Sequence, residues 1–213
     1  MRTPDSWHKA QATVAIAVVT AIAYVIVSTF RADGWAADAG GFVPATVGGP
    51  IGAQLVPWFL TPLTATLLHA SFAHLAFNLL IFVFCGRAVE NVLGPASQVV
   101  LYLAGAYAAA AGQYAAGPHA DIVMIGASGA ASAVIGAYAM LFGRNRVRVA
   151  NNRLAVWLNA LWLLAAWVVM QVAVGIVLGE ADGLMLAVGA HIGGFVAGLA
   201  LARPLLLWRY RKA

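Results

Sequence analysis

Six long apolar segments constrain the fold of this chain more than any other feature of its sequence. Each is long enough, or nearly so, to cross about 30 Å of hydrocarbon as a helix rising about 1.5 Å per residue. The fourth is the shortest, about 24 Å as a helix, which predicts that it begins below the membrane surface at a loop buried in protein. The segments are predicted at 12–30, 67–84, 99–116, 127–142, 154–178 and 184–207.

Composition supports a membrane protein. The chain is 63% hydrophobic and 9% charged, whereas soluble domains are about 45–50% apolar and about 25% charged. With 213 residues we predict one domain, 1–213, with an all-α polytopic fold. The first apolar run lacks a signal-peptide cleavage site and is predicted to remain as a helix. Cys85 lies in an apolar run, so no internal disulfide is expected.

The basic residues predict the orientation. If both termini are cytoplasmic, Arg31 is the only one of the 12 Lys and Arg residues outside. This is a strong positive-inside pattern, so the net charge of +5 reflects topology and not nucleic-acid binding. It predicts a cytoplasmic segment 1–11, an external loop 31–66 and a cytoplasmic basic tail 203–213. The acidic residues predicted outside are Asp33, Asp38, Asp121, Glu180 and Asp182.

The external loop 31–66 is long, rich in Gly and Pro, and carries Trp35 and Trp58. Loops of this length inside compact proteins tend to be functional or disordered, and its aromatic residues suggest that it rests in the membrane interface. A simple connector is the alternative. No internal repeat is apparent, so an inverted-repeat transporter gains no support.

Polar residues near the start of the second segment form a first candidate group. His74 and Asn78 are four residues apart and share a helix face, whereas His69 need not face the same way. No carboxylate accompanies them and no HExxH motif occurs, so we expect no metal site. Histidines hydrogen-bonded within the bundle are the alternative interpretation.

Ser128 lies between glycines at the start of the fourth segment, in GASGAASAVIG. Ser128, Ser132 and Gly136 form a stripe of small residues that lets another helix approach closely. Gly126 and Gly129 allow a tight turn and access to the serine. Free backbone N–H groups at a helix start suit an oxyanion. A small packing residue is the alternative.

His191 in the sixth segment completes the pattern, because Gly194 and Gly198 follow it on the same helix face. If this stripe packs against the Ser128 stripe, an imidazole comes within hydrogen-bonding reach of a serine hydroxyl. Asp182 is too far along the helix to orient the ring, whereas spacing alone does not exclude Asp121. No span carries an interior carboxylate, so an aspartyl protease is disfavoured. We therefore predict a Ser–His dyad.

Four motifs together resemble the rhomboid family of intramembrane serine proteases. They are HASFAHLAFN, GRAVENVLG with Glu90, GASG with Gly136 beyond it, and AHIGGFVAG. Each is weak alone, but all four occur in the family's order. The resemblance covers residues from about 58 to the C-terminus and implies a bundle of six transmembrane helices, without metal or cofactor, that hydrolyses peptide bonds within or beside transmembrane segments of protein substrates.

The resemblance also implies individual roles. Ser128 would be the nucleophile, His191 its general base, and His74 and Asn78 oxyanion donors. Two positions depart from the family: Phe59 stands where many relatives have Arg after Trp, and Ser132 stands where many have an aromatic residue stacked on the catalytic histidine. Supporting structural positions would be Gly126, Gly129, Gly136, Gly194, Gly198 and Glu90.

A second function class stays open: a catalytically silent rhomboid-like protein that binds transmembrane helices. Such relatives usually lack the serine or the histidine, and this chain has both. A small transporter has little support, because charged residues are absent from the interior of the spans. The expected location is a bacterial cytoplasmic membrane, with both termini cytoplasmic.

Overall fold

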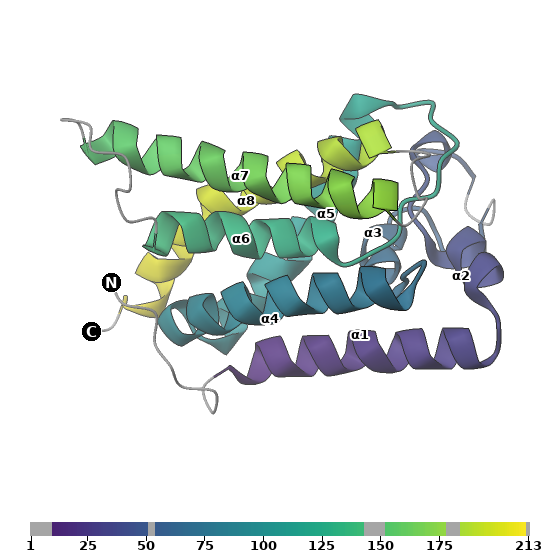
Figure 1. Cartoon of the computed structure of the whole chain (residues 1–213), viewed down its shortest axis with the longest axis horizontal. Coiled ribbons are helices and arrows are strands. Elements are labelled where there is room, and N and C mark those ends of the chain that lie inside the picture. The colour runs from purple at the N-terminus through teal and green to yellow at the C-terminus, as the bar shows by residue number, and fades with distance from the viewer. Residues whose placement is uncertain (1–9, 51–53, 143–151, 178–183, 212–213) are drawn as a thin grey trace.

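The fold is a bundle of long helices, with a single isolated antiparallel bridge, between Phe42 and Met124, in the described part of the chain. The computed structural model describes residues 10–50, 54–142, 152–177 and 184–211. The long helices run side by side, and shorter elements gather at one end of the bundle (Figure 1). The long helices are α1 (Gln11–Thr29), α4 (Phe72–Leu93), α5 (Pro95–Ala116), α6 (Ser128–Phe142), α7 (Asn152–Val177) and α8 (Leu184–Arg209).

The predicted bounds 67–84 of the second segment were wrong at both ends. Ser71 is extended, and its side chain accepts the backbone N–H of His74 at 3.1 Å, so α4 begins only at Phe72. At the other end α4 continues to Leu93 and ends at Gly94, whose φ is +84°. This last part was not predicted from hydropathy because it contains polar residues such as Glu90, which is buried and bonded to α1.

The predicted external loop 31–66 is largely ordered. It contains α2 (Asp33–Gly40), the 3₁₀ turn η2 (Pro44–Thr46), α3 (Thr61–Thr64) and most of η3 (Ala65–Leu67). The Thr64 hydroxyl donates to the Gly40 carbonyl at 2.6 Å, which ties two of these elements together. The Ala65 carbonyl accepts the backbone N–H of Gly126 at 2.8 Å. This region therefore packs on the chain that leads into α6.

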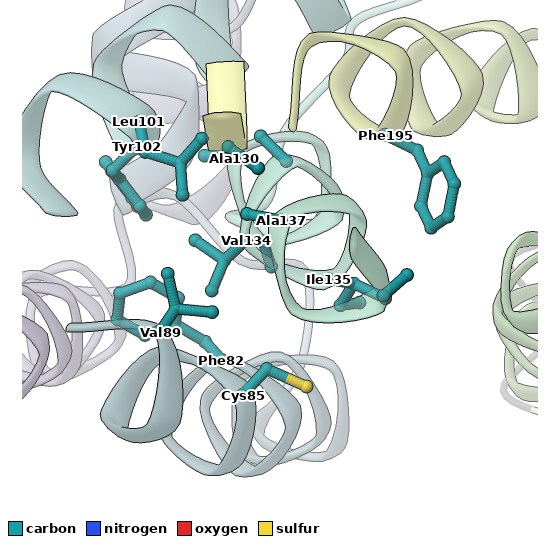
Figure 2. Packing of buried hydrophobic residues seen from close by; sticks show 14 of the residues in the cluster. Phe82, Cys85, Val89, Leu101, Tyr102, Ala130, Val134, Ile135, Ala137 and Phe195 are labelled. Carbon is teal, nitrogen blue, oxygen red and sulfur yellow. The ribbon is translucent and has the colours of Figure 1, made fainter. Parts of the chain in front are cut away.

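Helix α6 lies at the centre of the bundle. Ala130, Ala131, Ala133 and Val134 are all fully buried, and Figure 2 shows side chains of α4, α5 and α8 around this helix. A helix enclosed by other helices does not need to cross the whole bilayer by itself. Its length of 15 residues agrees with the predicted short fourth segment.

Glycines bring α8 unusually close to α6. A Cβ atom at Gly198 would collide with the carbonyl oxygen of Ala133, and one at Gly194 with that of Gly129. A Cβ at Gly136 would likewise collide with the carbonyl of Phe195. The two predicted stripes do meet, although α8 packs on Gly129 and Ala133, each one residue beyond the positions of the stripe expected on α6.

A second glycine contact, between α5 and α8, was not predicted. A Cβ at Gly112 would collide with the carbonyl oxygen of Gly189, and one at Gly193 with that of Ala108. Helix α8 is therefore held by close backbone contacts on two sides. These contacts fix the depth at which His191 lies in the bundle.

Glu90 holds the start of α1 against α4. Its carboxylate accepts the backbone N–H groups of Ala12 at 2.8 Å and Thr13 at 2.7 Å, and also the Thr13 hydroxyl at 2.7 Å. These N–H groups belong to the first turn of α1, where a helix leaves donors unpaired and favours negative charge. Glu90 thus joins α4 to the first turn of α1.

Four helices among the described residues are long and apolar enough to cross a membrane: Gln11–Thr29, Phe72–Leu93, Pro95–Ala116 and the Val188–Arg209 part of α8. The apolar stretches Ser128–Phe142 and Trp157–Met170 are shorter. Six spans therefore remain a prediction. Helices α4, α6 and α8 all start at the end of the bundle that carries α2 (Figure 1). Glu180, Asp182, residues 1–9 and residues 212–213 lie outside the described residues.

The close glycine contact between α6 and α8 predicts that one added methyl group lowers the stability of the protein. We expect Gly198→Ala to lower the free energy of unfolding by about 1–3 kcal/mol, because α8 must move away from Ala133. Gly34→Ala in α2 is the matched control, since nothing lies within 4 Å of a Cβ there. Unfolding in mixed micelles measures both variants, and equal stabilities would contradict the contact.

Candidate active site

A turn at Gly126 presents Ser128 at the first residue of α6. Gly126 has a backbone φ of +115°, a conformation that residues other than glycine rarely adopt. Its N–H donates to the Ala65 carbonyl, while Met124 pairs with Phe42. The chain is thus anchored on both sides of the turn. Ser128 itself is half-buried, whereas Gly126 and Ala127 are buried.

The structure brings His191 of α8 to Ser128 of α6. The imidazole Nε2 atom lies 2.9 Å from the serine Oγ atom. His191 is 5% exposed, so this pair is largely shielded from bulk solvent. When Nε2 carries no proton, it accepts the hydroxyl hydrogen, which is the arrangement that general-base activation of a nucleophile requires.

His74 and Asn78 of α4 point at the same turn. A Cβ atom at Gly126 would lie 2.8 Å from the His74 Nε2 atom and 3.5 Å from the Asn78 Nδ2 atom. Asn78 is fully buried, and neither polar atom of its amide has a hydrogen-bond partner among the described residues. Buried polar groups nearly always have partners, so an amide left open beside a serine suits a transient negative oxygen.

His69 binds the backbone of the residue that follows Gly126 in this turn. Its Nε2 atom accepts the backbone N–H of Ala127 at 3.3 Å, and its ring packs edge-to-face on His74 with centroids 5.1 Å apart. Burial, and next the charge of His74, lower the pKa of His69 to about 3, while the backbone of Leu67 acts in the opposite direction. His69 is therefore neutral at pH 7, as its acceptor role requires.

The glycines predicted to support the site lie at close helix contacts. Gly129 faces α5, where a Cβ would collide with the Ala109 side chain. Gly194 faces α6 beside Ser132, whose Cβ would be 3.2 Å from an added Cβ. A larger residue at Gly129 would push α6 away from α5, and one at Gly194 would push α8, which carries His191, away from α6.

Trp167 of α7 is a site neighbour that sequence reasoning missed. Its indole N–H donates to the Ser132 hydroxyl oxygen at 2.8 Å, and its ring lies edge-to-face to His191 with centroids 6.0 Å apart. A signal was present: tryptophan prefers the membrane interface, yet Trp167 falls near the middle of an apolar segment. Such a position indicates a polar partner inside the bundle.

Of the two acidic residues considered for a third catalytic position, the structure describes one. Asp121 is exposed in the segment before α6, and Asp182 lies outside the described residues. Within the ranges that the structure describes, no group of three or more His, Cys, Asp or Glu side chains is placed to hold a metal ion. The described site offers the contact between the Ser128 hydroxyl and the His191 imidazole.

These features define a helical membrane protein with a shielded serine–histidine pair at the start of a short central helix. A model of the rhomboid domain matches residues 58–208, and the chain belongs to the rhomboid family. It is therefore an integral, multi-pass membrane protein.

The chain is also similar to the rhomboid protease GlpG of Enterobacter sp. (strain 638), with 32% identity over 142 residues. The matched stretch covers 65% of this chain and 46% of that protein. The chain thus spans about half the length of the curated relative that it matches.

The neutral state of His69 predicts how stability depends on pH. The pKa of His69 is about 3 in the folded protein against 6.5 for an unperturbed group, so the unfolded chain binds a proton first and stability falls as the pH drops below about 6.5. His69→Gln keeps an acceptor for Ala127 but cannot titrate.

As the pH falls, we expect the free energy of unfolding of His69→Gln to decrease less than that of the wild type. The difference in slope should be up to about 1.4 kcal/mol per pH unit between pH 6 and 4. Unfolding titrations in micelles at several pH values give the slopes. Identical slopes for the two proteins would show that His69 takes up no proton on unfolding.

Proposed function

We propose that this protein is an intramembrane serine endopeptidase that cleaves transmembrane-segment-containing proteins through the Ser128–His191 pair. One observation carries the proposal: the 2.9 Å contact between Ser128 Oγ and His191 Nε2 in a shielded site. Family membership and the similarity to a rhomboid protease support the reaction class.

The first half of the reaction forms an acyl-enzyme. His191 Nε2 takes the hydroxyl proton as Ser128 Oγ attacks the carbonyl carbon of the scissile bond. The carbonyl oxygen becomes negative and is stabilised by the backbone N–H of Ser128 and by the side chains of His74 and Asn78. The imidazolium of His191 then protonates the leaving amine as the C–N bond breaks.

The second half releases the acyl group to water. His191 removes a proton from a water molecule, which attacks the ester carbonyl, and the same donors stabilise the second oxyanion. The proton then returns from His191 to Ser128 as the ester bond breaks. No metal or cofactor takes part in this scheme.

The site's place at one end of the bundle favours entry of water from one side of the membrane. Helices α4, α6 and α8 start at the end that carries α2, and Ser128 is the first residue of α6 (Figure 1). With the positive-inside pattern, we propose that this end is external and that both termini are cytoplasmic. The proposed setting is the cytoplasmic membrane of a bacterium, with 1–213 forming one six-span domain.

The proposal predicts that Ser128→Ala abolishes cleavage of a model transmembrane substrate in proteoliposomes. His191→Ala should do the same, since an unactivated serine is a weak nucleophile. Ser28→Ala is the matched control, because Ser28 lies at the end of α1, and it should cleave at the wild-type rate. Continued cleavage by Ser128→Ala would overturn the proposal. A folded wild-type protein that binds the substrate without cleaving it would favour the silent helix-binding alternative.

Asn78 is predicted to act on the transition state alone. Removing an oxyanion donor commonly costs about 10²–10³ in kcat, and we expect a loss of up to that size for Asn78→Ala with little change in KM. Kinetics in proteoliposomes separate the two constants. A loss confined to KM would indicate that Asn78 binds substrate and not the oxyanion.

A further inference from the structure

Trp167 and Ser132 form a hydrogen-bonded pair whose directions follow from chemistry. An indole N–H can only donate, so the Ser132 Oγ atom accepts it. The single hydroxyl hydrogen of Ser132 is then directed to the Ser128 carbonyl, which lies 2.7 Å away. A continuous chain of hydrogen bonds therefore runs from α7 through α6 to the backbone of the nucleophile.

The same tryptophan touches the histidine of the dyad. Its ring lies at 67° to the His191 ring, with centroids 6.0 Å apart, which is an edge-to-face arrangement. Phe77 of α4 stacks on Trp167 with an interplanar angle of 8°. Trp167 is 3% exposed and Ser132 is fully buried, so few other orientations are open to the indole.

Several large residues of α7 face away from the bundle. Leu161, Trp162 and Val169 are 59–66% exposed. Trp167 differs from them in both burial and hydrogen bonding. Lipid chains would offer its indole N–H no hydrogen-bond acceptor, and a buried indole N–H without a partner would destabilise the helix at this position. The contacts with Ser132 and His191 therefore explain why a tryptophan stands at position 167.

We propose that Trp167 is a positioning residue for His191, and that the Trp167–Ser132 pair supplies the ring contact that an aromatic side chain at position 132 would otherwise make. This inference rests on the proposed protease function. The small Ser132 leaves room for the indole and also holds it by a hydrogen bond. The indole in turn limits rotation of the imidazole away from Ser128.

Two mild substitutions test the pair. Trp167→Phe keeps a ring but removes the donor, and Ser132→Ala removes the acceptor together with the bond that its hydroxyl donates to the Ser128 carbonyl. Losing one hydrogen bond corresponds to about a 2- to 13-fold change. We expect kcat to fall by about that factor in each variant, with KM nearly unchanged because the substrate contacts remain. The double variant should lose no more than Ser132→Ala alone, since that change already removes the bond to Trp167.

Trp162→Phe is the matched control, because Trp162 lies on the same helix and is 66% exposed. It should keep the wild-type kcat. Thermal unfolding of each variant in micelles shows whether the protein is folded at the assay temperature. A merely structural role of the pair would lower stability without changing the kcat of the folded enzyme.

A rescue experiment tests the ring contact itself. Trp167→Ala removes both ring and donor and should lower kcat by about 10- to 100-fold through misplacement of the base. Adding Ser132→Tyr should restore several-fold of that loss, because the tyrosine ring can enter the volume that the indole vacates. In the presence of Trp167 the same Ser132→Tyr change should instead lower activity by crowding.

Wild-type kcat in both single variants, additive losses, or effects confined to KM would each overturn the inference. These outcomes are separable from failure of the proposed function. If Ser128→Ala still cleaves substrate, the protease assignment fails. If cleavage requires Ser128 but is indifferent to Trp167 and Ser132, only the positioning role fails.

Discussion

The close approach of α8 to α6 is the contact on which the rest of the site depends. Packed helices usually lie about 8–10 Å apart. Here Gly194 and Gly198 meet the backbone carbonyls of Gly129 and Ala133 directly, which small residues permit in membrane bundles. Only at such a separation can a short serine side chain reach an imidazole on the neighbouring helix, as the Ser128–His191 distance of 2.9 Å requires.

Among the described residues, the polar groups around this contact form no cluster of side chains that could hold a metal ion. His69 uses its neutral form to hold the turn before Ser128, and the Asn78 amide stays open beside that turn. Trp167 and Ser132 pair with each other next to His191. Each polar group thus has a partner or faces the reacting position, which is the condition for keeping polar atoms inside a bundle. Glu90, the one buried carboxylate among the described residues, binds the start of α1.

Periodicity and residue size were sufficient to predict the all-helical membrane fold, the short central helix and the approach of two small-residue stripes, although the contact on α6 lies one residue beyond the predicted positions. They were insufficient where a helix end depends on a local hydrogen bond, as at Ser71, or where polar residues continue a helix, as around Glu90. The α5–α8 contact through Gly112 and Gly189 was not predicted, because neither glycine belongs to a motif that contains candidate catalytic residues. Trp167 was missed because its partner, Ser132, had been considered as a small packing residue and as the site of a missing aromatic ring, and not as a hydrogen-bond acceptor.

The most direct test of the central claim is to map the adduct of a fluorophosphonate probe on the native protein by peptide mass spectrometry. The account predicts a single adduct, on Ser128, whose formation depends on His191 and is lost in His191→Ala. An adduct on another serine, or undiminished labelling of Ser128 without His191, would contradict the claim that the approach of α8 to α6 creates an activated nucleophile.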